Sequence, residues 1–265
     1  MHNDLHALIS IINFELKIVR EWILSNKLTL NISKSHYLIF HRKRVPVVLD
    51  PIVMGDHNLE RMTNTKFLGV ILQENLKWDK HIQFVADKVN KISGLLYLTR
   101  HKLSFNALKL IHFSLVYPYF AYCQTVWGAA GNSKLNQLVI AQKRVIRTMS
   151  FMGRRDHTND AFVNFNLLKL HDINIYFCAI YTYKAINQLI QNRYFTFRHS
   201  NHYSLRNQDL LRLPSVGSTQ SKSFIEFHGS QIWNSLPFEI RSKPSIQSFK
   251  YALRTHLISK YSDPS

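Results

Sequence analysis

The start of the chain has the hydrophobic spacing of a helix. Over residues 5–24, apolar side chains recur every three or four positions, and Asn3 or Asp4 precedes them as a candidate N-cap. This spacing predicts an amphipathic helix of about five turns.

Extended segments follow this predicted helix. Residues 35–40 and 45–54 are rich in β-branched and aromatic side chains, residues 55–58 are turn-forming, and residues 66–72 are a short apolar run that predicts one strand. We therefore predict a helix followed by a small antiparallel sheet over residues 1–75.

Helical periodicity dominates after residue 75. Asp79 is a candidate cap for a helix whose apolar stripe runs over residues 82–96 and whose opposite face carries lysines. Similar stripes predict three further helices, over residues 104–116, 134–149 and 173–190. Residues 76–190 are thus expected to be mainly α-helical.

The last part of the chain divides into an aperiodic segment and a short helical region. Residues 191–220 are rich in Asn, Arg, His and Ser without periodicity, which indicates a long loop or linker. Residues 221–265 contain two helical patterns, at 224–233 and 245–261, on either side of Pro237, and Ser245 after Pro244 is the candidate cap of the second. The predicted fold class is α+β, with strands near the N-terminus and a helical remainder.

One apolar stretch is long enough to cross a bilayer. Residues 110–133 contain no Lys, Arg, Asp or Glu. Polar and aromatic side chains are spread through the middle of this stretch instead of gathering at its ends, which favours a buried helix and a turn. We therefore expect no membrane partner.

The charge of the chain narrows the range of partners. Its 265 residues include 34 Lys and Arg against 16 Asp and Glu, a formal net charge of +18. Residues 88–155 contain no acidic residue, so this stretch cannot neutralise its own cations. Nucleic acid would supply the missing negative charge. The alternative is a basic surface that binds nothing specific.

Several kinds of site lack their sequence signatures. The chain has no GxGxxG, GK[ST], GxSxG or HExxH motif, no Asp-Asp or Asp-x-Asp pair, and no His cluster at ligand spacing, so we assign no residue to a metal. Cys123 and Cys178 are too far apart for a CxxC zinc site. Few cysteines and the lack of a signal-peptide pattern predict an intracellular location, in the nucleus or the cytoplasm.

Five groups of motifs, in order along the chain, resemble one family. They are Trp22-x3-Asn26-Lys27-Leu28 leading to Lys34-Ser35; Lys66-Phe67-Leu68-Gly69-Val70 with Leu76-x-Trp78-x2-His81-Ile82; Tyr117-Pro118 with Val126-Trp127-Gly128; Gln142-Lys143-Arg144-x2-Arg147; and Trp233-Asn234-Ser235-Leu236-Pro237 with Phe249-Lys250. Their order resembles the reverse transcriptases of non-LTR (LINE-type) retrotransposons, the jockey-like group especially, beyond the catalytic Asp-Asp motif.

The resemblance implies part of an RNA-directed DNA polymerase. Residues 1–75 correspond to the end of the palm with its primer-grip strand, and residues 76–190 to a thumb-like region. The family carries its metal-binding aspartates upstream of the segment that begins at Trp22, so we expect this chain alone to be an inactive fragment. Mg²⁺ is implied only for the intact parent enzyme, and the upstream polymerase half is a candidate partner.

The resemblance also implies roles for individual residues. Lys34 matches a catalytic lysine near the triphosphate, which serves as a charge clamp or as a proton donor to the leaving pyrophosphate. Phe67, Leu68 and Gly69 match the primer grip, where a small residue lets the backbone approach the primer terminus. The plain alternatives are a solvated Lys34 and a glycine required by a bulge or close packing.

Cations of the thumb-like helices are candidates for binding the phosphates of an RNA template and DNA primer duplex. They are Lys88, Lys91, Arg100, Lys102, Lys143, Arg144 and Arg147. The alternative is that these residues lie on solvated helix faces. Trp78, Trp127 and Trp233 are candidates for stacking on bases, although their apolar neighbours favour burial.

Three hypotheses follow from the sequence. The first is a reverse-transcriptase fragment that retains template-primer binding elements. The second is a stand-alone basic RNA- or DNA-binding module without catalysis, and the third is a protein-interaction bundle over residues 82–190. A thumb should prefer a primed hybrid duplex over a single strand, whereas a generic basic module should rank its ligands by charge density.

Overall fold

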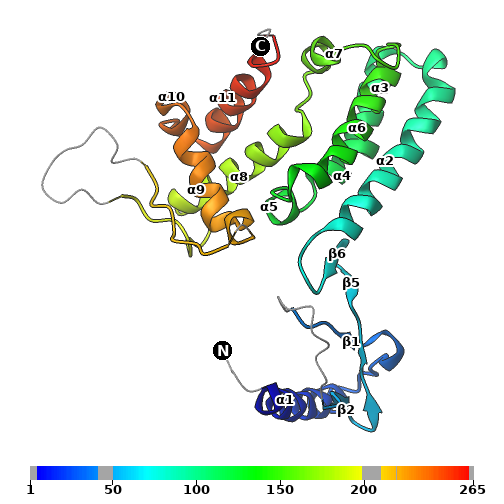
Figure 1. Cartoon of the computed structure of the whole chain (residues 1–265), viewed down its shortest axis with the longest axis vertical. Coiled ribbons are helices and arrows are strands. Elements are labelled where there is room, and N and C mark those ends of the chain that lie inside the picture. Colours follow the sequence, from blue (N-terminus) through cyan, green and yellow to red (C-terminus); the bar gives the residue numbers. More distant parts are fainter. Residues whose placement is uncertain (1–4, 41–49, 199–209, 219, 263–265) are drawn as a thin grey trace, which may run out of the picture. The chain divides into compact units, whose positions relative to one another are not determined.

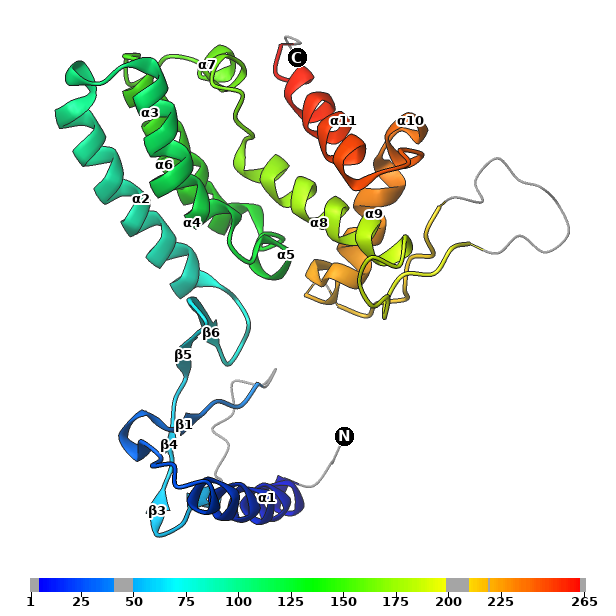
Figure 2. The ribbon, with the colours of Figure 1, turned by 180° about the vertical axis from the view of Figure 1, so that it is seen from behind.

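The computed structural model describes residues 5–40, 50–198, 210–218 and 220–262 (Figures 1 and 2). The chain divides into two compact units, the N-terminal unit of residues 1–80 and the helical unit of residues 81–265. Among the described residues, short strands occur in the N-terminal unit, and helices with connecting loops form the other. The predicted α+β class is confirmed.

The described part of the N-terminal unit combines one long helix with very short strands. Its elements are α1 (Leu5–Ser25), the 3-10 turn η1 (Ile32–Lys34), β1 (His36–Tyr37), β2 (Val53–Met54), β3 (His57–Asn58), β4 (Glu60–Arg61), β5 (Asn64–Phe67) and β6 (Val70–Gln73). The helix predicted over residues 5–24 is confirmed by α1. Its candidate caps, Asn3 and Asp4, lie outside the described residues, as do residues 45–49 of a predicted strand.

The strands pair two by two. β1 pairs with β4 in parallel, whereas β2 with β3 and β5 with β6 form antiparallel hairpins. Gly55, with φ at +64°, lies in the turn between β2 and β3, where glycine avoids the steric cost of a positive φ. The expected small sheet is therefore a set of separate pairs, one of them parallel.

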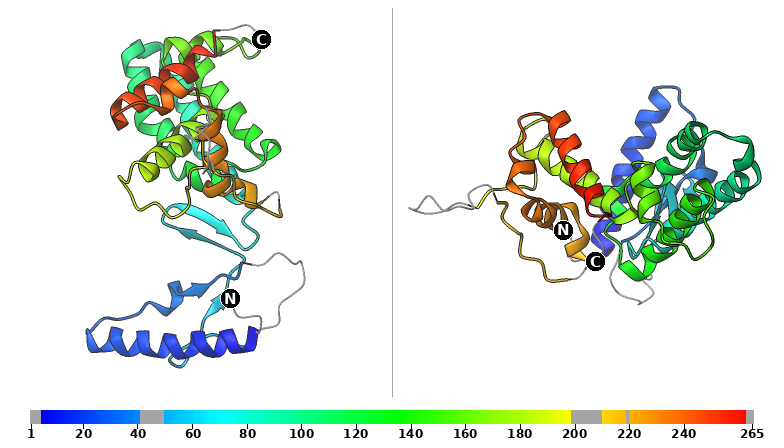
Figure 3. Two further views of the ribbon diagram at one scale, coloured as in Figure 1. Left: turned by 90° about the vertical axis from the view of Figure 1, so that its left-hand side faces the viewer. Right: turned by 90° about the horizontal axis from the view of Figure 1, so that it is seen from above.

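The segment predicted as one strand, residues 66–72, is a β-hairpin (Figure 3, left view, cyan). Phe67 and Val70 pair across its turn. Leu68 and Gly69 both have positive φ, at +45° and +86°. Two consecutive positive φ values are typical of a type I′ turn, whose twist matches that of the flanking strands. The continuous apolar run concealed this turn in the sequence.

Replacing Leu68 by Asn should raise the free energy of unfolding by about 1 kcal/mol, because a positive φ costs Asn less conformational energy than it costs Leu. Gly69→Ala should lower it by about 1 kcal/mol for the converse reason. Urea unfolding of the full chain measures both changes. Equal midpoints for Leu68→Asn and the parent chain would contradict a strained turn.

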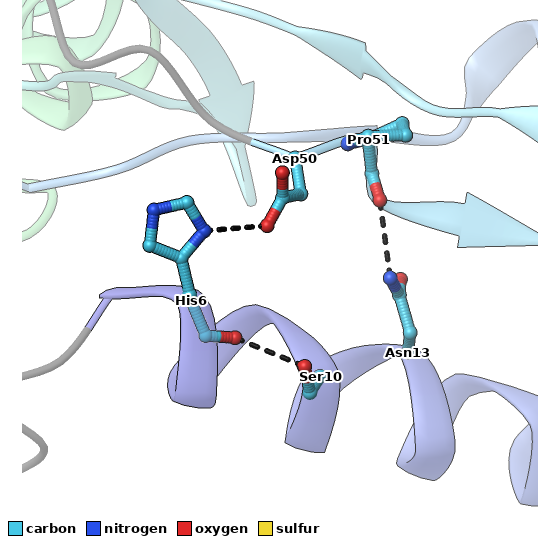
Figure 4. Close-up of polar contacts among 5 residues, drawn as sticks. All are labelled: His6, Ser10, Asn13, Asp50 and Pro51. Atoms are coloured by element: carbon cyan, nitrogen blue, oxygen red, sulfur yellow. Dashed lines mark hydrogen bonds and ion pairs between the residues drawn. The ribbon is translucent and has the colours of Figure 1, made fainter.

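Polar contacts fix α1 to the segment that leads into β2 (Figure 4). The Nδ2 of Asn13 donates to the carbonyl oxygen of Pro51 at 3.1 Å, and its Oδ1 accepts from the N–H of Val53 at 2.9 Å. His6 Nδ1 lies 2.6 Å from Asp50 Oδ2. The same helix exposes large apolar side chains, which are Ile11, Phe14, Ile18, Val19, Trp22 and Leu24.

Helices make up most of the described part of the helical unit. They are α2 (Asp79–Thr99, which starts in the N-terminal unit), η2 (Arg100–Lys102), α3 (Phe105–Ile111), the π-helical turn η3 (His112–Val116), α4 (Tyr117–Ala121), α5 (Gln124–Trp127), α6 (Asn132–Met149), α7 (Asn159–Asn164), α8 (Leu170–Ile186), η4 (Ser221–Ser223), α9 (Ile225–Ser235), α10 (Phe238–Arg241) and α11 (Ile246–Ser259). All the helices predicted beyond residue 75 are confirmed, with shifted ends.

Two local features explain where these helices begin and bend. Ser245 caps α11 through a reciprocal pair of hydrogen bonds with Ser248, as the sequence predicts for its start. The helix expected over residues 104–116 begins after its cap Ser104 but continues through the π-helical turn into α4. No helix of the described segments is both long and apolar enough to cross a membrane.

α8 forms the centre of the helical unit. It carries no charged residue between Asp172 and Lys184, and beyond His171 none of its residues is exposed. A helix that is apolar all round requires neighbours on several sides. α5, α9 and α11 supply them, and Figures 1 and 2 show α9 and α11 next to α8.

Amide side chains of one buried and one half-buried residue connect segments that are far apart in the sequence. Gln142 of α6 donates from Nε2 to the carbonyl oxygen of Leu168 at 3.0 Å and accepts at Oε1 from the N–H of Leu170 at 2.9 Å. Asn234 of α9 makes the same kind of pair with the backbone of Leu211, which belongs to the predicted loop over residues 191–220. These amides replace backbone partners that the loop and the first turn of α8 lack.

Candidate nucleic-acid interface

The three tryptophans that are candidates for stacking on bases are buried. Their exposed fractions are 8% for Trp78, 0% for Trp127 and 3% for Trp233. Burial at this level leaves no ring face open to a base. The structure therefore supports the core position that their apolar neighbours predicted.

Residues next to Trp127 are also part of the core. The ring of His81 meets the indole edge-on at 5.2 Å, and burial lowers the pKa of His81 to about 4, so this imidazole is neutral at pH 7. Gly128 has no room for a side chain, since a Cβ there would lie 1.8 Å from Oε1 of Gln124. His81, Trp127 and Gly128 therefore contribute to the packing of the core.

Two predicted cations lie on the exposed face of α2. Lys88 and Lys91 are both exposed, whereas Val85 and Val89 of the same helix are buried. The ammonium group of Lys88 lies 5.6 Å from the ring centroid of Phe84. Spacing of three residues places the two lysines on one face, where both are accessible to an anion.

α6 contributes a third exposed cation, Arg144. Nη1 of Arg144 donates to Oδ1 of Asn90 on α2 at 2.9 Å, so the two helices are joined side by side. Lys143 and Arg147 on the same helix are half-buried. The Nε of Arg147 donates to the backbone carbonyl of Asp156 at 3.0 Å, which leaves only part of its guanidinium for a ligand.

The guanidinium group of Arg100, a predicted phosphate contact, interacts with other residues of the protein. Its guanidinium carbon lies 4.6 Å from the ring centroid of Tyr97 and 5.0 Å from that of Phe151, and Nη1 lies 3.4 Å from the carbonyl oxygen of Thr148. Arg100 thus connects the end of α2 to the end of α6. Lys102, two residues later, is exposed.

None of these seven cations forms an ion pair with a carboxylate within the described segments. The same region exposes two more, Arg154 and Arg155, in the loop after α6. The sequence-based prediction does not include these two arginines, because it was limited to cations on predicted helices. The acid-free stretch over residues 88–155, which contains both, was the available signal.

The remaining predicted site residues belong to the N-terminal unit. Lys34 is exposed at the end of η1, where its backbone N–H lies 3.2 Å from Oδ1 of Asn31. Phe67 and Leu68 are 61% and 74% exposed at the tip of the β5–β6 hairpin, and Gly69 is exposed beside them. The predicted primer grip is therefore an apolar hairpin tip, and its role stays a prediction.

The described residues do not fit a Mg²⁺ pair. Two-metal catalysis needs clustered carboxylates, and no group of three or more His, Cys, Asp or Glu side chains in the described segments could hold a metal ion. We therefore derive no catalytic step through a metal.

Comparison with known proteins identifies relatives of part of the chain. Over 136 residues, 49% of the chain, it is 26% identical to the "Probable RNA-directed DNA polymerase from transposon X-element" of Drosophila melanogaster. Over 103 residues, 36% of the chain, it is 33% identical to the "RNA-directed DNA polymerase from mobile element jockey" of the same species. Over this part the chain is similar to mobile-element reverse transcriptases.

These alignments confirm the resemblance to non-LTR retrotransposon reverse transcriptases, within definite limits. The matched segment spans 14% of the X-element protein and 11% of the jockey protein. No family model matches the chain, and no solved structure matches it. The similarity therefore rests on sequence, and the activity of the whole relatives does not transfer automatically to this segment.

Proposed function

We propose that this chain is the template-primer binding part of a non-LTR retrotransposon reverse transcriptase. The observation that carries the proposal is its similarity, over about half its length, to RNA-directed DNA polymerases. The exposed cations of α2 and α6 support it, because they offer positive charge with no acidic neighbour paired to it in the described segments.

The expected binding mode is contact with phosphates. Lys88 and Lys91 on α2 and Arg144 on α6 are exposed on two helices that a hydrogen bond connects, and each keeps polar hydrogens for an anion. Phosphate contacts fix the position of a duplex without reading its sequence. The helical unit would accordingly hold an RNA–DNA hybrid of any sequence and release counterions as it binds.

Catalysis would require residues that this chain does not supply. The sequence holds no Asp-Asp or Asp-x-Asp pair. Within a complete polymerase, Lys34 would lie near the triphosphate and the Phe67 to Gly69 tip would contact the primer terminus. We therefore expect the chain alone to incorporate no dNTP with Mg²⁺ or Mn²⁺, and extension of a primer on an RNA template would contradict this.

Binding to three ligands of equal phosphate number tests the proposal. Fluorescence anisotropy should show tighter binding of a primed RNA–DNA hybrid than of single-stranded RNA or DNA. Affinity should fall steeply between about 50 and 200 mM salt, because several phosphate contacts release counterions. Affinities that follow charge density alone would identify a generic basic module, and the absence of binding would contradict both.

A further inference from the structure

A cavity of ≈ 440 Å³ opens on the helical unit between the start of α3, the end of α6 and α7. Its size falls within the range of sites that bind small organic ligands. Apolar side chains form much of its lining, among them Leu108 and Met149. The proposed phosphate-binding face consists of Lys88, Lys91 and Arg144, and none of these residues lines the cavity.

Three aromatic rings, those of Phe105, Phe151 and Phe165, belong to the lining of this cavity. The rings of Phe105 and Phe165 stack at 4.5 Å with an interplanar angle of 16°. Phe165 is buried, so it supports Phe105, which is half-exposed. A supported ring with one open face is a platform on which another planar ring can stack.

Phe151 adds a second ring in an unusual backbone conformation. Its φ is +55°, a value that a bulky side chain rarely adopts, and it directly follows the C-cap residue of α6. Its half-exposed ring lies 5.1 Å from that of His101 and 5.0 Å from the guanidinium carbon of Arg100. These contacts hold an aromatic ring at the cavity, although the positive φ of this residue favours glycine or asparagine.

Three polar side chains line the same cavity. Oγ of Ser150 is buried and has no hydrogen-bond partner, which is unusual for a buried hydroxyl. Asp160 and Asn164 belong to exposed positions of α7. Together they offer a carboxylate, an amide and a hydroxyl, which can accept and donate hydrogen bonds at the edge of a planar ligand.

Cationic residues lie close in the sequence to two segments that line the cavity. Lys102 precedes a lining residue, Leu103, and Arg154 and Arg155 follow another, Met152. The three cations are exposed. An apolar peptide would leave the polar groups and these cations unmatched, whereas a nucleotide brings a planar base, polar edges and a phosphate.

We propose that this cavity binds one unpaired nucleobase of a single-stranded segment that continues from the bound duplex. The base stacks on Phe105 and Phe151, its polar edge meets Ser150 and Asp160, and the adjoining phosphates contact the neighbouring cations. This inference rests on the proposed function, since it extends the phosphate-binding face by a site for the unpaired strand.

The test uses the full chain and an RNA–DNA hybrid with a single-stranded overhang that contains 2-aminopurine. Stacking in the cavity should quench the 2-aminopurine fluorescence on binding. An overhang of abasic nucleotides keeps the phosphates but removes the bases, and we expect it to bind about tenfold more weakly. This comparison needs no protein variant and is therefore independent of any folding defect.

Protein variants locate the effect. Phe151→Leu and Ser150→Ala should each reduce the quenching and the difference between the normal and abasic overhangs. Phe238→Leu is the matched control, because Phe238 is an exposed phenylalanine of α10 outside the cavity. It should leave both readouts unchanged.

The two proposals fail in different ways. If the blunt hybrid binds and the normal and abasic overhangs bind equally, the cavity does not hold a base and the proposed function stands. If quenching persists in Phe151→Leu and Ser150→Ala, the base stacks elsewhere and the inference is overturned. If neither the blunt hybrid nor the overhang binds, the proposed function itself is wrong.

Discussion

Exchanging Lys88, Lys91 and Arg144 together for glutamine is expected to weaken binding of an RNA–DNA hybrid by about 100-fold or more. Each charge-assisted contact with a phosphate contributes roughly 1 kcal/mol or more, and three such losses reach this factor. Glutamine retains helix propensity and much of the side-chain length. The slope of log affinity against log salt should also fall by about 3 in magnitude.

A matched variant separates a defined face from net charge. It exchanges three lysines on other parts of the helical unit for glutamine, Lys222, Lys250 and Lys260. Anisotropy titrations at several salt concentrations should show a much smaller loss for this control. Equal losses in the two triple variants would mean that affinity follows net charge, which contradicts a duplex face on α2 and α6. Unfolding midpoints of both variants check that they are folded.

Trp127→Ala is expected to lower the free energy of unfolding by about 3–5 kcal/mol. The indole is completely buried, and its Nε1 donates to the carbonyl oxygen of Tyr122 at 2.8 Å, so the substitution leaves both a cavity and an unpaired carbonyl. Trp127→Phe keeps a ring but loses the hydrogen bond, and should cost about 1–3 kcal/mol. Urea unfolding followed by circular dichroism measures these differences.

The same substitution at an exposed tryptophan provides the control. Trp22 on α1 is 60% exposed, and Trp22→Ala should change the free energy of unfolding by less than about 1 kcal/mol. A loss for Trp127→Ala no larger than for Trp22→Ala would show that the indole does not support the helical unit. Such a result would instead favour a role for Trp127 in ligand binding.

Long periodic helices were predictable from the sequence because their pattern repeats several times. The sequence predicts the ends of α1, α6 and α11 to within a few residues, and it predicts the cap at Ser245. The β5–β6 hairpin and α7 could not be predicted from the sequence, since a two-residue turn and a helix of six residues give too little periodicity. Their geometry depends on contacts that only the folded chain makes.

The candidate site was predictable in chemistry but not in detail. Sequence alone indicates which residues are cationic, and it cannot show that Arg100 and Arg147 are held by the backbone carbonyls of Thr148 and Asp156. These acceptors carry no sequence signature, because every residue has a carbonyl.

Several residues that carry the family resemblance turn out to support the fold. Trp127 and Gly128 fill the core, while Gln142 and Asn234 satisfy buried backbone groups. Similarity of motifs in this chain therefore reports a shared architecture at least as much as shared chemistry. Lys34, Lys66 and Arg144 are exceptions among the motif residues, since they are exposed and cationic.

The enclosure of α8 makes the helical unit cooperative. A helix without an exposed side cannot open alone, because α5, α9 and α11 must separate from it together. Loss of α11 would remove one of these walls and expose apolar surface on α8, and α8 in turn anchors α6 through Gln142. α11 lies outside the phosphate-binding face, yet it stabilises α8 and through α8 the helix α6, which carries part of that face.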